Sequence, residues 1–264
     1  MARGFESHSL RHIVGGNMNK IVKDKVNKIL VLTIIVIAFF ISLVIMLKYK
    51  TEGETKMPFI ISELMCVSSA DATSKETNEQ NNKWNLDINQ YNDVYISLKK
   101  NEKYSKNAFI KSITIKNLRV NNPNIGTVEV YMPNTDEKKL FSYDENLKVN
   151  DSVTFKGGAV TDFKNLTVSN QGGNIVFRIV NRKVSEYVSN NDDEIAYDGS
   201  LLQKTNVSVA DIKFTITFDI IIETENTKYK GTKTLNLPCD NVEIEGVSKT
   251  LDYECKDIIF KREK

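Results

Sequence analysis

The chain has 264 residues, with 36 Lys and Arg against 34 Asp and Glu, which gives a net charge of +2. Residues 1–17 carry +1 and residues 18–50 carry +5, so the remaining 214 residues carry −4. A mildly acidic C-terminal part lacks the clustered basic face that nucleic acid binding requires, so the composition excludes nucleic acid as a partner.

Residues 1–17 contain both histidines of the chain, His8 and His12, and show neither a helical nor a strand period. The back-translated sequence of residues 4–12 resembles the end of a transfer RNA gene, and a ribosome-binding site can encode residues 15–17. We therefore expect residues 1–17 to be a leader outside the natural protein, which then begins at Met18. A cloning tag or a disordered cytoplasmic tail is the alternative. In each case the remainder of the chain, from residue 18 onward, contains no histidine.

Residues 29–47 read ILVLTIIVIAFFISLVIML, a run without charge, glycine or proline. As a helix they extend roughly 28 Å, close to the hydrocarbon core of a bilayer at about 30 Å. The sequence continues with Lys48-Tyr49-Lys50 and not with the small residues of a signal-peptide cleavage site. The sequence therefore predicts one transmembrane helix, a signal-anchor that inserts in the lipid bilayer.

Lysines flank this apolar run unequally. Four lysines precede it, within residues 18–28, and two follow it, Lys48 and Lys50. The positive-inside rule then favours an N-terminus in the cytoplasm. We expect a short cytoplasmic tail over residues 18–28, a polar linker over residues 48–56 and an extracellular domain over residues 57–264, in a single-pass protein of the plasma membrane.

From residue 57 onward the apolar residues recur with period two, most clearly in residues 212–222, which predict a strand. Residues 227–237 are predicted to pair with it through the two-residue loop at 225–226. In this register Lys233 faces Phe218, which indicates a shorter strand or one at a sheet edge. The predicted pairs are Ile222 with Tyr229, Ile216 with Leu235 and Phe214 with Leu237.

The rest of the C-terminal part reads as further short strands and turns. Strands are predicted at residues 84–88, 94–98, 113–115, 126–132, 152–156 and 258–261. Two more hairpins are expected, between residues 163–168 and 175–180 and between residues 242–245 and 250–253. A polar loop is expected at residues 69–82, and one or two helical turns at residues 184–191. These elements predict an all-β fold, a β-sandwich or jelly-roll-like barrel; two small immunoglobulin-like domains divided near residues 143–151 are the alternative.

The chain has three cysteines, Cys66, Cys239 and Cys255, an odd and sparse set that is not a disulfide framework. In the register expected for the hairpin of residues 242–253, Cys239 and Cys255 point to opposite faces. We therefore expect free thiols, although a β-bulge would let these two cysteines pair.

Without a histidine after residue 12, sites of the Ser-His-Asp and Cys-His types are excluded. The glycine pairs at 157–158 and 172–173 lack the strand–helix context of a phosphate loop and indicate turns. The run Asn191-Asp192-Asp193-Glu194, with Asp198, offers oxygen ligands to Ca²⁺ but matches no known loop and fits a solvated turn. A glycosidase needs two carboxylates across a cleft, which a sequence cannot single out. We assign no catalytic, cofactor-binding or metal-binding residue.

Exposed tyrosines can stack on sugars or anchor a protein partner, whereas ordinary cross-strand pairing is the alternative role. The tyrosines at turns or on polar faces of the predicted strands are Tyr91, Tyr95, Tyr104, Tyr131, Tyr143, Tyr187 and Tyr197.

Three stretches, NQGGNIVFRIVN, DEIAYDGSLL and KMPFIISELMCVSSADA, resemble a family of single-pass exported proteins of low-GC Gram-positive bacteria. The resemblance covers most of residues 57–262 and implies the same topology, but that family has no assigned activity or catalytic residue. We expect a non-catalytic, membrane-tethered β-sandwich that binds or assembles with an envelope protein or a wall glycan. The alternative is a carboxylate-dependent hydrolase of envelope glycans.

Overall fold

The computed structural model describes residues 9–78, 83–104, 106–133, 139–190, 193–243, 249–253, 255 and 257–263. For residues 9–21, 76–78 and 249–253 it describes the backbone alone. The chain forms two compact units, Met1–Gly53 and Glu54–Lys264.

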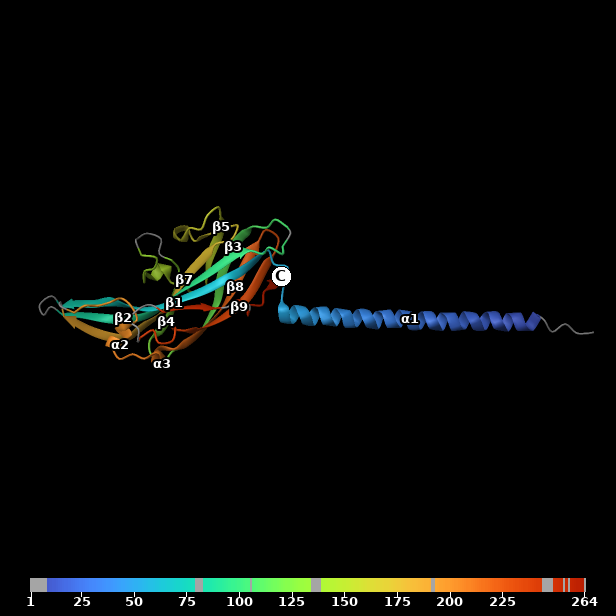
Figure 1. Cartoon of the computed structure of the whole chain (residues 1–264), viewed down its shortest axis with the longest axis horizontal. Coiled ribbons are helices and arrows are strands. Elements are labelled where there is room, and N and C mark those ends of the chain that lie inside the picture. The colour runs from blue at the N-terminus through green and yellow to red at the C-terminus, as the bar shows by residue number, and fades with distance from the viewer. Residues whose placement is uncertain are drawn as a thin grey trace, which may run out of the picture. The chain divides into compact units, whose positions relative to one another are not determined.

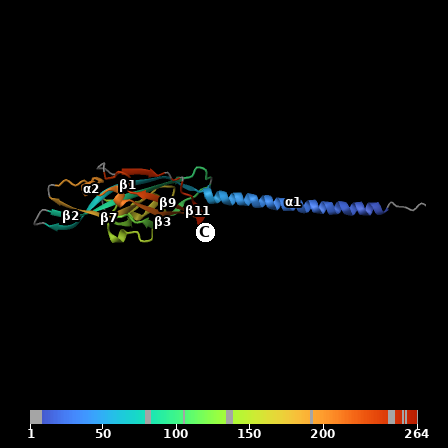
Figure 2. The same cartoon turned by 90° about the horizontal axis from the view of Figure 1, so that it is seen from below.

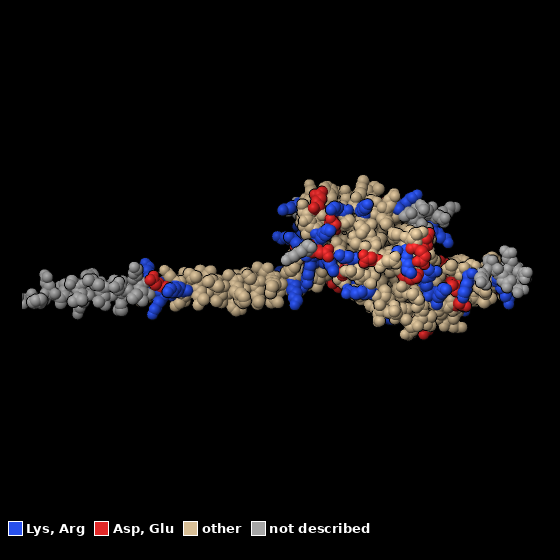
Figure 3. All heavy atoms as spheres, turned by 180° about the vertical axis from the view of Figure 1, so that it is seen from behind, with Lys and Arg blue, Asp and Glu red and all other residues tan. Residues whose placement is uncertain are grey.

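The first unit is one long helix, α1, Ser9–Glu52. Within Val22–Glu52 an 18-residue window has a mean hydropathy of 3.3, and none of that window is buried. Figure 3 shows a stretch of this helix surface without charged side chains. The hydroxyl of Thr33 donates to the Ile29 carbonyl at 2.9 Å, so this polar group is satisfied within the helix. The helix is therefore long and apolar enough to cross a membrane.

Gly53 ends the helix in a left-handed conformation, with φ of 70°, and its N–H donates to the Tyr49 carbonyl. The next residue, Glu54, already belongs to the second unit, because its N–H donates to the Phe260 carbonyl at 2.7 Å. Its carboxylate also accepts from Arg262 Nε at 2.6 Å. The linker predicted over residues 48–56 is thus helical over its first five residues.

The second unit is all-β and consists of two packed sheets (Figure 1). We call the five-stranded sheet, with strand order β10-β1-β2-β7-β4, sheet A, and the six-stranded sheet, with order β11-β9-β8-β3-β5-β6, sheet B. Both sheets draw strands from before and after residues 143–151, so the unit is one sandwich. Sheet A consists of β1 Phe59–Asn78, β2 Lys83–Lys100, β4 Thr127–Tyr131, β7 Asn174–Asn190 and β10 Lys249–Tyr253. Sheet B consists of β3 Ile110–Asn121, β5 Ser152–Gly158, β6 Thr167–Ser169, β8 Phe214–Thr224, β9 Lys228–Leu237 and β11 Lys261–Glu263.

Alternating apolar residues of the two sheets meet in the main core. Phe177 of β7 and Phe218 of β8 form its centre, with ring centroids 5.3 Å apart in a T-shaped arrangement.

β1, β2 and β7 have 17 to 20 residues each, whereas no strand of sheet B exceeds 12. Part of the inner face of sheet A is therefore covered by two short helices, α2 Ser200–Lys204 and α3 Val209–Ile212, over a second apolar cluster. Figure 2 shows α2 beside this end of the sheet.

The predicted hairpin of β8 and β9 is confirmed in its register. Phe214 lies opposite Leu237, Ile222 lies opposite Tyr229, and Phe218 lies opposite Lys233. The Lys233 side chain is 3% exposed and reaches Asp257 with both N–O distances at or below 3.0 Å. Within the described residues, β11 covers only the first three residues of β9, so most of β9 has a single partner, as the inward lysine indicated.

Two predictions about the polar stretches are wrong. Of the loop expected at residues 69–82, residues 69–78 continue β1, and of the helical turns expected at residues 184–191, residues 184–190 continue β7; residues 79–82 and 191 lie outside the described residues. Both stretches pair with β2, which supplies backbone hydrogen bonds over its full length. A long-range partner therefore fixes strands that local apolar periodicity does not reveal.

Two predicted hairpins are also wrong. Residues 163–165 form a 3₁₀ turn, β6 pairs in parallel with β5 of sheet B, and β7 lies in sheet A. Gly172, with φ of 115°, lies in the connection that crosses between the sheets. β10 pairs with β1. Of its expected partner strand, residues 242–243 form a turn and residues 244–245 lie outside the described residues.

Candidate functional site

The outer face of sheet A, which points away from sheet B, is partly covered by the chain after β4. Along β2, Tyr91 and Asp93 alternate with core residues, and along β7 Arg178 does the same, so these three side chains lie on the outer face. The chain returns over them at Phe141, whose ring lies 4.5 Å from the Arg178 guanidinium carbon. This layer leaves an open hollow beside β1.

We call this hollow the aromatic cavity; it measures about 750 Å³. Its wall includes four aromatic rings, those of Tyr91, Phe141, Tyr143 and Tyr197. β2 supplies the first ring, the chain between β4 and β5 supplies the next two, and the chain between β7 and α2 supplies Tyr197. The side chain of Asp71 on β1 also lines it. The volume lies in the range of small-molecule sites, about 300–1,000 Å³.

Arg178 forms a rigid floor for the aromatic cavity. Its Nε and Nη2 donate to the two carboxylate oxygens of Asp93 at 2.6 and 2.8 Å. The guanidinium carbon also lies over two rings, 4.0 Å from the centroid of Tyr91 and 4.5 Å from that of Phe141. Burial acts to lower the pKa of Arg178, but the hydrogen bonds and charge of Asp93 outweigh it and raise this pKa. The Arg178 guanidinium is therefore ionised, its charge is neutralised by Asp93, and contacts with Asp93 and two aromatic rings hold it in place.

Tyr143 contributes a hydroxyl as well as a ring. The ring meets that of Tyr131 edge-on at 5.7 Å. The hydroxyl oxygen is buried and has no hydrogen-bond partner among the described residues. Burial raises the pKa of Tyr143, so this hydroxyl stays protonated and can both donate and accept. A buried polar atom without a partner is costly, and a ligand hydroxyl would satisfy it.

A second hollow, which we call the Trp84 cavity, measures about 630 Å³ and shares Ala72 and Tyr197 with the aromatic cavity. Its side chains Ala72 and Leu86 pack with the second apolar cluster, so it opens on the inner face of sheet A. The two cavities thus meet across β1, where Tyr197 is 61% exposed. Trp84, the single tryptophan of the chain, is 41% exposed.

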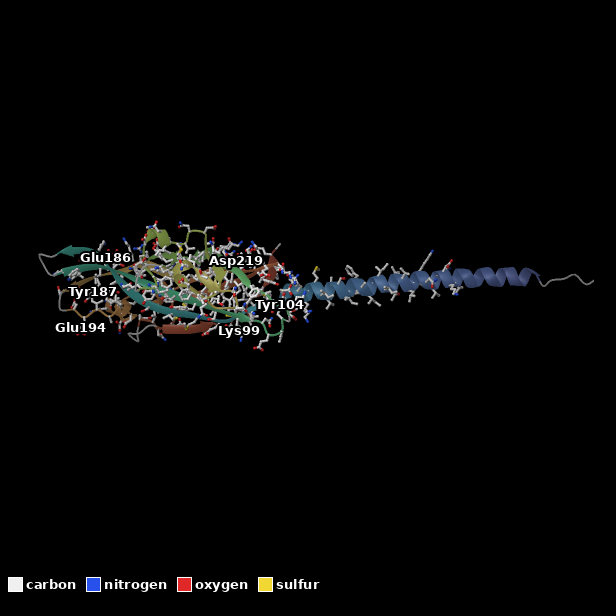
Figure 4. The ribbon with its side chains drawn as sticks, turned by 90° about the horizontal axis from the view of Figure 1, so that it is seen from above. Lys99, Tyr104, Glu186, Tyr187, Glu194 and Asp219 are labelled. Carbon is white, nitrogen blue, oxygen red and sulfur yellow. The ribbon has the colours of Figure 1, made fainter. Side chains whose placement is uncertain are left out.

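The backbone of β1 forms an edge where the cavities meet. β10 pairs with Leu64–Ser68, whereas from residue 69 onward β1 pairs with β2 alone among the described residues. Figure 4 places Tyr187 and Glu194 at this end of the sandwich and Lys99 and Tyr104 at the other. Phe59, at the start of β1, pairs with Lys100 at that other end. The two cavities therefore lie far along β1 from the point where the chain enters the sheet.

The predicted tyrosines fall into two groups. Tyr91, Tyr143 and Tyr197 line the aromatic cavity, and the Tyr187 hydroxyl bonds to Asp193 of the Trp84 cavity at 3.2 Å. The others do not line either cavity. Tyr131 is buried and donates to Glu129, Tyr95 is half-buried on β2, and Tyr104 lies at the opposite end of the sandwich.

Sequence reasoning missed Trp84, Phe141 and Arg178. In the sequence, Trp84 lies at the end of a predicted strand, Phe141 in a loop and Arg178 within a strand, and none of these positions indicates a site. The contact between Phe141 and Arg178 and the pairing of the strands depend on residues far apart in the sequence. The uniqueness of Trp84 was the one signal available.

The described residues of the acidic run 191–194 and Asp198 do not form a group of ligands placed around a metal ion. Asn191 and Asp192 lie outside them. Asp193 accepts from the Asn190 N–H at 2.9 Å, which lowers its pKa, and Asp198 accepts from the Ser200 N–H at 2.8 Å. The described part of the chain contains no group of three His, Cys, Asp or Glu placed to hold a metal ion.

Charge is mixed over the second unit. On the face seen in Figure 3, Lys and Arg alternate with Asp and Glu and do not gather in one basic area. Comparison of the chain with protein-family models, with curated proteins and with solved structures found no match.

Proposed function

We propose that this protein is a membrane-anchored binding module of the bacterial cell envelope, and that it holds a glycan chain in the aromatic cavity. The observation that carries the proposal is the set of four rings around one open cavity with a neutralised arginine floor. Sugar rings present apolar C–H faces that stack on aromatic side chains, and hydroxyls that need partners. Tyr143 lines the cavity, and its hydroxyl has no hydrogen-bond partner among the described residues.

The two cavities favour an extended ligand over a single sugar. They share Ala72 and Tyr197, so a chain that fills the aromatic cavity can cross β1 and reach Trp84. Charge gives no preference for an acidic ligand, because Asp93 neutralises Arg178, and Asp71 and Lys139 on the cavity wall carry opposite charges. A largely neutral glycan fits this lining.

The location is part of the proposal. The excess of lysines before the apolar helix favours a cytoplasmic N-terminus and an extracellular sandwich. The resemblance to exported single-pass proteins of Gram-positive bacteria points the same way. A tether at the membrane raises the effective concentration at the wall, which makes a weak interaction useful.

A protein partner is the second candidate, favoured by the edge of β1. A peptide can add a strand to the backbone groups that follow residue 68. An envelope-glycan hydrolase finds less support. Asp71 and Asp193 line the cavities, but hydrogen bonding lowers the pKa of Asp193, whereas a general acid needs a raised one.

The test is a titration of the full chain in detergent micelles with purified wall glycan fragments of increasing length, followed by calorimetry and by Trp84 fluorescence. We expect saturable binding, and a fluorescence change only with fragments long enough to cross β1. Removing the Tyr197 ring removes a stacking contact of about 1 kcal/mol, so Tyr197→Ala should raise the half-saturation concentration roughly fivefold.

Phe109→Ala is the matched control, because Phe109 is an exposed ring, at 37%, that lines neither cavity. Equal weakening by both variants, or the absence of glycan binding, contradicts the proposal. Crosslinking of an envelope protein at β1 instead of glycan binding supports the second candidate. Release of glycan fragments that Asp71→Asn abolishes identifies a hydrolase.

A further inference from the structure

Two of the three cysteines meet between the sheets. Cys66 lies on the inner face of β1, opposite Val94, and Cys239 follows β9 by two residues. Both are buried, at 0% and 1% exposure, and Cys239 Sγ lies 3.8 Å from the carbonyl oxygen of Cys66. They come from chain segments 173 residues apart, one in sheet A and one just after a strand of sheet B. None of the three cysteines is in a disulfide in this structure.

The surroundings of the two thiols differ. The N–H of Cys239 donates to Ser68 Oγ at 3.0 Å, and Ser68 Oγ lies 3.0 Å from Cys239 Sγ. Hydrogen bonding with Cys66 and with Ser68 lowers the pKa of Cys239, against the effect of burial. The same contact with Cys239, together with burial, raises the pKa of Cys66. Cys239 is therefore the nucleophilic member of the pair, and Cys66 is the thiol beside it.

We propose that Cys66 and Cys239 are a redox pair that closes into an inter-sheet disulfide by exchange with a low-molecular-weight disulfide. The Cys239 thiolate attacks one sulfur of the small disulfide, forms a mixed disulfide and expels the first small thiolate. Cys66 then loses its proton and attacks Cys239 Sγ, which closes the protein disulfide and expels the second small thiolate. The two protein thiols are oxidised by two electrons, and one small disulfide is reduced to two small thiols.

Burial determines when the exchange can occur. A small disulfide reaches the pair while the segment after β9 is undocked, either during folding or in a local opening. Once closed, the bond ties β1 of sheet A to the end of β9 of sheet B. Such a bond persists in an oxidising compartment, which agrees with the extracellular location proposed above, but its formation does not depend on the ligand.

Cys255 is the internal control of this proposal. It is half-buried, and burial raises the pKa of its thiol. The sequence predicted free thiols and left a Cys239–Cys255 bond through a bulge as the alternative, whereas the pair proposed here joins Cys239 to Cys66.

The experiment equilibrates the full chain in detergent micelles with mixtures of reduced and oxidised glutathione, in dilute urea to promote local opening. Free thiols are alkylated, and the products are read by intact mass and by peptide mapping. We expect loss of two hydrogens, a crosslinked peptide pair that contains Cys66 and Cys239, and one alkylated thiol at Cys255. Oxidation should also raise the melting temperature.

The Cys255→Ser variant should retain the mass loss and the rise in melting temperature, whereas Cys66→Ser and Cys239→Ser should lose both. Circular dichroism of each variant checks that it folds, and the peptide map of the unmodified chain gives the answer independently of the variants. Three alkylated thiols after equilibration in oxidised glutathione refute the proposal. A bond between Cys239 and Cys255, or glutathione that remains attached to Cys66 and Cys239, refutes it equally.

Discussion

The pairing of Asp93 with Arg178 leads to a quantitative prediction for Asp93→Asn. The two side chains are 12% and 13% exposed, and the contact has two short hydrogen bonds, at 2.6 and 2.8 Å. Loss of one partner from a buried ion pair costs about 3–5 kcal/mol because the remaining charge stays buried. An asparagine oxygen still accepts one of the two bonds, so we expect a loss of about 2–3 kcal/mol.

For a β unit of this size that loss corresponds to a fall of roughly 5–10 °C in melting temperature. The assay is thermal unfolding of the full chain in detergent micelles, followed by circular dichroism in the strand band. Glu186→Gln is the matched control. Its carboxylate also lies 2.6 Å from a cation, Lys75, but the two side chains are 70% and 47% exposed, so its removal should leave the melting temperature unchanged.

The double variant Asp93→Asn/Arg178→Gln measures the interaction free energy between the two side chains. Once the arginine charge is gone, the Asp93→Asn change should cost much less, so the two effects should not add. Equal melting temperatures for Asp93→Asn and Glu186→Gln would refute the reasoning. So would strict additivity in the double variant, because it would mean that the two side chains do not interact.

Three further predictions concern the core, pH and topology. Phe218→Ala removes the ring that meets Phe177 in the main core and should destabilise the unit by about 3–5 kcal/mol in urea unfolding, whereas exposed Phe109→Ala should change little. Burial acts to raise the pKa of Asp219, but hydrogen bonds from Asn117, Thr232 and Lys230 lower it to about 2. Because the folded-state pKa is depressed, this group should contribute about 2 kcal/mol above pH 4 that is lost as the pH falls towards 2, and Asp219→Asn should remove that pH dependence. Protease added to intact protoplasts should degrade the sandwich; full protection would place it in the cytoplasm.

The sequence predicted correctly those elements whose conformation depends on neighbouring residues alone. The apolar helix needs only a run of apolar residues, and β8 and β9 need only alternation and a two-residue loop. The sequence did not predict the C-terminal parts of β1 and β7, residues 69–78 and 184–190. Most of their side chains are polar, and their strand conformation comes from pairing with β2. The redox pair escaped for a similar reason, since its members lie in different sheets.

The candidate site was predictable only in part. Three of the tyrosines predicted to be exposed do gather around one cavity, as the hypothesis of a binding surface required, although only Tyr197 is exposed. Their gathering depends on a loop between β4 and β5 that folds back over sheet A and brings Phe141 onto Arg178. Chain crossings of this kind connect residues that are far apart in sequence, so no local period reveals them.

The long pairing of β1 with β2 has a mechanical consequence. The proposed membrane tether joins the sheet just before Phe59, whereas the cavities begin at Asp71, roughly 40 Å further along the strand. A force between the membrane and a bound wall polymer would therefore act along β1. The hydrogen bonds to β2 lie across that direction and would be loaded together in shear, not opened one after another from an end. This arrangement would resist forced unfolding and suits a module that remains folded while the wall and the membrane pull against each other.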